Sequence, residues 1–129
     1  MSNPGSITLP AVAGALFAGV GVAAGAMGNH ALRSLIAEPL LLIYETAVRY
    51  QIYHALGLLA VAALAPHLTV RGVRLVSWLF IAGILCFCGS LYILALTGAR
   101  PLGMLTPVGG TLFMAGWAVL AWHAWRARR

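Results

Sequence analysis

Four long apolar stretches, separated only by short breaks, constrain this chain more than any other feature of its 129 residues. Hydrophobic residues make up 62% of the sequence and charged residues only 8%, whereas about 25% of the residues in a soluble domain are charged. A helix needs roughly 20 apolar residues to cross a hydrocarbon layer of about 30 Å. We therefore expect a single all-α domain, an integral membrane bundle of four transmembrane helices.

The expected spans cover residues 7–27, 46–65, 74–96 and 107–125. A cleaved signal peptide is the alternative for the first span, because the small residues of 24–26 resemble a cleavage site. That stretch is long and lacks a basic leader, however, which favours a retained span. Gly28 and Asn29 predict a break after the first span, and His30 to Ala37 predicts a short interfacial helical segment between the first two helices.

The second helix carries most of the hydrogen-bonding side chains. It is predicted from Pro39 to Ala65, about 40 Å, which exceeds the hydrocarbon thickness. Counting back about 20 residues from its end places Arg49, Gln51 and His54 at hydrocarbon depth, with Glu45 at the edge. An arginine there costs at least ~2.5 kcal/mol unless it is paired or reaches the interface. We therefore predict an ion pair between Glu45 and Arg49, one turn apart.

The candidate site is this polar cluster, which is either structural or a relay for ions or protons: His30, Glu45, Arg49, Tyr50, Gln51, His54, Ser90 and Tyr92. At 100° per residue, His54 lies about 180° from Glu45, so their two faces cannot line one narrow path. We expect His54 to bond to Ser90 or Tyr92 of the third span. The alternative is a proton carrier, because histidine titrates near neutrality.

A second set of residues is small enough to let helices pack closely in lipid: Gly14, Ala18, Gly21, Gly25, Gly109, Gly110 and Gly116. The small residues of the first and fourth spans provide more close-packing surface than one four-helix bundle needs. This excess favours contacts with a second copy or with other membrane-protein subunits.

The net charge of +6 comes from eight arginines and two glutamates, and the chain has no lysine. The arginines stand singly at span ends, where they suit lipid headgroups and orientation, so we expect a lipid bilayer and no nucleic acid as partner. Four spans place both termini on one side. Five arginines there against three on the other favour cytoplasmic termini.

We expect no metal and no cofactor. The four histidines fall at opposite membrane edges, with no His pair at helical spacing. Cys86 and Cys88 are two positions apart on a helix, which suits neither a mutual disulfide nor a thiolate metal site. We find no nucleophile motif, phosphate-binding loop or carboxylate pair, so an enzyme is the least favoured class.

Recognisable motifs cover nearly the whole chain, at residues 28–32, 44–56, 89–92, 102–103, 106–110 and 116–117. With these motifs the chain resembles one family, the small bacterial membrane proteins called domain of unknown function 423, whose eukaryotic relatives are named transmembrane protein 256. The resemblance implies a four-span protein of the bacterial inner membrane with no established activity.

Together these observations predict a non-enzymatic membrane protein that self-associates or serves as an accessory subunit of a membrane complex. The alternative is a small transporter or proton-coupled channel that uses Arg49, Gln51 and His54.

Overall fold

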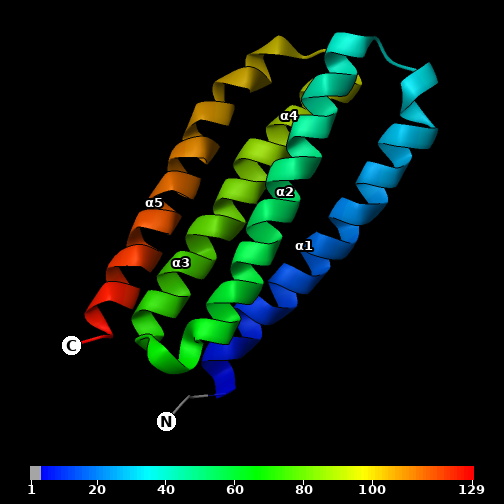
Figure 1. The fold of residues 1–129 in the computed structure, drawn as a ribbon. Helices are drawn as coiled ribbons and strands as arrows, with labels where there is room; N and C mark the ends of the chain where they lie inside the picture. The colour runs from blue at the N-terminus through cyan, green and yellow to red at the C-terminus, as the bar shows by residue number, and fades with distance from the viewer. Residues whose placement is uncertain (1–3) are drawn as a thin grey trace.

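The structure is a computed structural model that describes residues 4–129, and these residues form a bundle of four long helical rods (Figure 1). In chain order the helices are α1 (Pro4–His30), α2 (Glu38–Leu64), α3 (Val70–Gly83), α4 (Gly89–Thr97) and α5 (Thr106–Arg126). The π-helical turn η3 (Ile84–Cys88) joins α3 to α4, so these elements make one continuous rod. Each of the four rods is long and apolar enough to cross a membrane, which confirms the expected fold class.

The connection between α1 and α2 differs from the prediction. α1 continues through Gly28 and Asn29 to His30, so the break predicted there is wrong. Gly28 serves close packing instead, because an added Cβ would come within 2.8 Å of the Tyr44 ring on α2. The interfacial segment predicted from His30 to Ala37 is reduced to a single 3-10 turn, Leu32–Ser34.

The starts of α2 and α5 lie within one residue of the predicted positions, whereas α3 begins at Val70, four residues before the predicted position 74. α2 begins one residue before Pro39, which occupies a first-turn position where its missing N–H has no helical partner to lose. α4 ends at Thr97, and the next residue, Gly98, closes the helix with a left-handed φ of 71°. A 3-10 turn, Arg100–Met104, then leads into α5.

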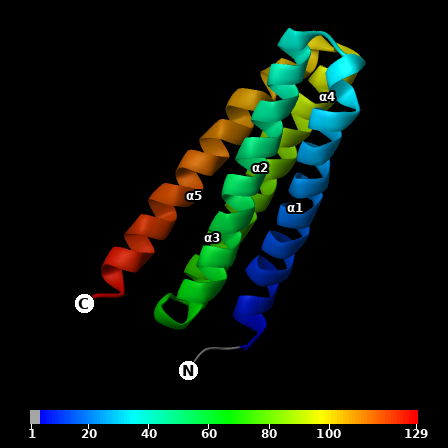
Figure 2. The same cartoon turned by 45° about the vertical axis from the view of Figure 1, so that its right-hand side comes forward.

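The two outer helices lie on opposite sides of the bundle. α1 packs mainly on α2, and α5 packs mainly on α3 (Figures 1 and 2). α2 and the α3–α4 rod lie between them and hold the buried core around Phe80, Val61 and Leu58. Polar side chains of α2 therefore face two separate interfaces, one toward α1 and one toward α5.

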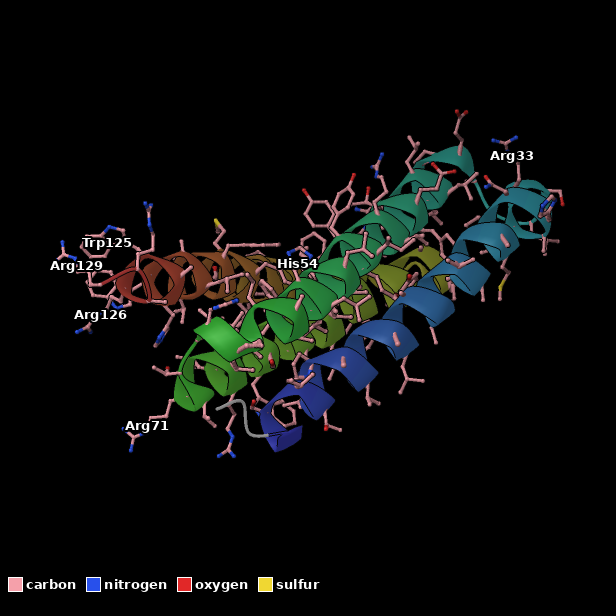
Figure 3. All side chains as sticks on the ribbon, turned by 60° about the horizontal axis from the view of Figure 1, so that its bottom comes forward. Arg33, His54, Arg71, Trp125, Arg126 and Arg129 are labelled. Carbon is pink, nitrogen blue, oxygen red and sulfur yellow. The ribbon has the colours of Figure 1, made fainter. Side chains whose placement is uncertain are left out.

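The basic residues gather at the two ends of the bundle. Figure 3 shows Arg71, Arg126 and Arg129 at the end where α1 begins and α5 stops, Arg33 at the opposite end, and His54 between them. The guanidinium of Arg129 lies 4.4 Å from the ring centre of Trp125. An aromatic and basic girdle of this kind is typical of a helix that leaves a membrane.

Candidate functional site

Gln51 joins three of the four rods. Its side chain is buried, and its Nε2 donates to the Phe17 carbonyl oxygen of α1 at 2.9 Å. Its Oε1 accepts a hydrogen bond from the Tyr92 hydroxyl of α4 at 2.7 Å. An amide without partners would cost several kcal/mol in hydrocarbon. Hydrogen bonds to two neighbouring rods therefore offset the free-energy cost of burying the Gln51 amide.

His54 makes the corresponding link toward α5. Its Nε2 lies 3.0 Å from Trp117 Nε1, and its Nδ1 lies 2.7 Å from the Tyr50 carbonyl oxygen. An indole N–H only donates, so Nε2 must accept and Nδ1 must carry the proton that goes to Tyr50. The Phe113 ring stacks on the imidazole with 3.5 Å between ring centres. His54 is thus a neutral imidazole with both nitrogens engaged.

The partners predicted for His54 are wrong. Tyr92 bonds to Gln51 instead, and Ser90 Oγ lies 2.9 Å from Thr106 Oγ1 at the start of α5. The reason is rotation along α2: three residues turn the helix by about 300°, so His54 points about 60° away from Gln51. That angle is enough to move it from the α4 interface to the α5 interface.

Glu45 and Arg49 do not pair within the described part of the chain, so the predicted ion pair is wrong. Arg49 is exposed and its Nη2 donates to Thr46 Oγ1 at 3.3 Å. Glu45 instead borders a polar pocket of about 330 Å³ beside Arg33 and Glu38, at the loop end of α2. The two charged side chains therefore have different surroundings and different contacts.

The remaining members of the cluster are His30 and Tyr50. His30 is exposed at the last position of α1. Tyr50 is 38% exposed, its carbonyl oxygen contacts His54, and its ring packs on Phe87 with 4.8 Å between centres. The eight predicted residues consequently do not form one site. They divide into an α1–α2–α4 link at Gln51, an α2–α5 link at His54 beside Tyr50, an α4–α5 link at Ser90, and the separate side chains of His30, Glu45 and Arg49.

Sequence reasoning missed three polar contributors. Tyr44 donates to the Ala24 carbonyl oxygen of α1 at 2.6 Å, and Thr106 and Trp117 supply the contacts from α5. The role of Trp117 could have been predicted from its position. Tryptophan in a spanning helix usually lies near a membrane interface, whereas Trp117 lies in the middle of α5.

Most of the predicted packing glycines lie between helices of the same chain. An added Cβ at Gly14 or Gly21 would come within 2.8 Å of α2 atoms, and Gly25 also faces α2. Gly109 and Gly116 approach Phe87 and Phe80 on the neighbouring rod, whereas Gly110 has only loose contacts. Ala18 is partly buried. Packing glycines that the prediction omitted are Gly28, Gly57, Gly72 and Gly83.

The polar side chains of the site hydrogen-bond the helices to one another. Every buried side-chain nitrogen or oxygen in residues 4–129 has a hydrogen-bond partner. In the same residues, no three His, Cys, Asp or Glu side chains lie together in a way that could hold a metal ion. The hydrogen bonds of Gln51, His54 and Ser90 join one helical rod to another.

The fold and this site define a small four-span membrane protein whose buried polar residues link its helices. Residues 24–110 match the family described as "Protein of unknown function (DUF423)", and the chain belongs to that family. A UPF0382 membrane protein of Staphylococcus saprophyticus is 45% identical over 109 residues, covering 84% of this chain and 90% of the relative. The UPF0382 membrane protein YwdK of Bacillus subtilis is 43% identical, covering 84% and 89%. No solved structure matches the chain.

Proposed function

We propose that this protein is non-enzymatic and works through helix contacts inside the membrane, primarily with a second copy of itself. In the accessory-subunit form of the proposal, the same surface meets another membrane protein. The observation that carries the proposal is the composition of α1, which has small residues on two opposite faces.

One face of α1 is occupied within the chain. Its glycines pack against α2, as described above. Even so, only 17% of the most apolar 18-residue stretch of this helix is buried. The opposite face is exposed and is also built of small residues, namely Ala15, Gly19, Ala23 and Ala26. A Cβ added at Gly19 would meet no atom within 4 Å. Small residues on an exposed face let another helix approach closely in lipid, which supports contact between chains.

The transport alternative receives less support from the geometry. It requires Arg49, Gln51 and His54 to line one path through the bundle. Arg49 is exposed, however, whereas Gln51 faces α1 and α4 and His54 faces α5. His54 can relay a proton only by giving up the Trp117 bond or the Tyr50 bond. Flux through reconstituted protein tests this alternative. Proton or ion flux that His54→Ala abolishes, without loss of folding, would restore it.

We also propose a cytoplasmic-membrane location with both termini in the cytoplasm. Arg71, Arg74, Arg126, Arg128 and Arg129 belong to the end where α1 starts and α5 stops, whereas Arg33, Arg49 and Arg100 belong to the other. Positive residues are enriched on the cytoplasmic side of membrane proteins, which supports this orientation. Reporter fusions at the C-terminus and in the loop before α2 test it.

Self-association is tested by energy transfer between donor-labelled and acceptor-labelled copies in liposomes diluted with lipid. We expect transfer that Gly19→Leu weakens at least about tenfold, roughly 1.4 kcal/mol of association free energy. Gly110→Leu on α5, also in a loosely packed position, is the matched control. A wild-type protein that stays monomeric at every dilution, and that crosslinks to no partner in native membranes, would overturn the proposal.

A further inference from the structure

A crevice runs between α1 and the α3–α4 rod and contains two cavities in succession. The first holds about 160 Å³ and is lined by Leu9 and Pro10 of α1 and by Val70, Arg74 and Ser77 of α3. The second holds about 500 Å³ and is lined farther along the same helices, by residues that include Leu16, Val20, Trp78, Leu85 and Cys88. A small pocket of mixed polarity that Arg74 borders is thus followed by an apolar groove.

Arg74 has no acidic side chain near it at this end of the bundle. The chain has only two acidic side chains, Glu38 and Glu45, and both lie at the opposite end of α2. Arg74 is exposed and makes no ion pair within the described residues. A guanidinium at the membrane surface with no carboxylate in reach attracts phosphate, which it binds through two parallel N–H bonds.

The apolar groove has the dimensions of one bilayer leaflet. Residues on one face of this rod follow one another at alternating steps of four and three positions. They are Arg74, Trp78, Ile81, Leu85 and Cys88. From Trp78 to Cys88 the rod rises about 15 Å, and half of a hydrocarbon layer of about 30 Å is the same length. The cavity volume also falls in the usual range of about 300–1,000 Å³ for ligand sites.

The groove is open sideways toward lipid, and its lining is almost entirely apolar. Leu16, Val20, Trp78 and Leu85 at its rim are exposed. Two of its polar side chains, Gln51 and Tyr92, bond to each other, so an apolar chain can lie beside them without displacing a partner. The indole N–H of Trp78 lies at the exposed rim of the groove.

We propose that this crevice binds one anionic phospholipid, with its phosphate on Arg74 and one acyl chain in the α1–α3 groove. The positive charge of Arg74 favours an anionic headgroup. The groove holds one acyl chain of a lipid in the bilayer leaflet whose surface lies at Arg74. The site is separate from the exposed α1 face proposed for self-association, so either proposal can fail alone.

The test is native mass spectrometry of the full chain released from nanodiscs of mixed phosphatidylglycerol and phosphatidylcholine. We expect wild-type protein to retain phosphatidylglycerol in preference to phosphatidylcholine. Arg74→Gln should reduce that preference about fivefold, the effect of one arginine near the headgroups. Arg71→Gln, a neighbouring arginine that does not line the crevice, is the matched control and should leave the preference unchanged.

A second pair of variants tests the groove. A Cβ added at Gly89 would meet no atom within 4 Å, and Gly89 lines the groove, so Gly89→Leu should fill it without disturbing the bundle. Retention of both lipids should then fall. Gly19→Leu adds the same side chain on the outer face of α1 and should retain lipid like the wild type. Equal retention of the two lipids by wild type, equal effects of the two arginine variants, or full retention by Gly89→Leu would overturn the proposal.

Discussion

Trp117 donates its indole N–H to Nε2 of His54 across 3.0 Å, and this bond links α5 to α2 inside the apolar part of the bundle. The imidazole also stacks on Phe113 of α5. A histidine that sequence alone presents as a candidate proton carrier is therefore held on two sides by one neighbouring helix.

Removing the indole donor should weaken this link. Trp117→Phe keeps an aromatic ring but leaves Nε2 of His54 without a partner, and we expect a loss of about 1 kcal/mol in the free energy of unfolding. Unfolding in mixed micelles with increasing SDS measures the change. Trp78→Phe is the control, because Trp78 is exposed and makes no side-chain hydrogen bond to another helix in the part of the chain that the structure describes. Equal losses in the two variants would contradict the role given to this bond.

The Gln51–Tyr92 pair should show energetic coupling. Gln51→Leu and Tyr92→Phe each break the 2.7 Å bond, so the double variant should lose less stability than the sum of the two single variants. We expect a coupling of about 0.6–1.7 kcal/mol, the range found for hydrogen bonds between membrane helices. The same unfolding assay measures all three variants. Strict additivity would show that the bond contributes nothing.

Two adjacent glycines of α5 provide an internally matched comparison. A Cβ at Gly109 would clash with the backbone of Phe87, whereas at Gly110 the nearest atoms are 3.9 Å away. We expect Gly109→Ala to destabilise the protein by about 1–3 kcal/mol, the usual cost of overpacking. Gly110→Ala should be neutral or slightly stabilising. Thermal unfolding in detergent compares them, and similar melting temperatures would refute the close approach at Gly109.

Glu45 and Arg49 should behave as independent charges. Because Arg49 bonds to Thr46 rather than to Glu45, a double-mutant cycle of Glu45→Gln and Arg49→Gln should give a coupling below about 0.3 kcal/mol. The measurement is the free energy of unfolding at low salt, where an ion pair is easiest to detect. A coupling of 1 kcal/mol or more would indicate the pair that the sequence predicted.

The four rods could be predicted from the sequence, because they follow from counting apolar residues against a fixed membrane thickness. The burial of Gln51 on the second helix agrees with its predicted place among apolar neighbours. The partners of His54 could not be predicted. They depend on how far each helix is rotated and on which ring fills the space between two rods, and neither quantity is encoded in one helix alone. Glycine composition was similarly ambiguous: Gly109 and Gly110 were both predicted as packing residues, yet Gly109 approaches Phe87 closely and Gly110 has only loose contacts.

The π-helical turn at Ile84–Cys88 has a consequence for chain length. A π turn accommodates one residue more than an α turn while the helix on either side keeps its direction. Deleting one residue inside this turn would give an unbroken α-helix with Phe80 and Tyr92 still facing their present neighbours. The same deletion elsewhere in the rod would swing everything after it by about 100°. Among relatives of this protein, gaps in the third rod should therefore concentrate at this one turn.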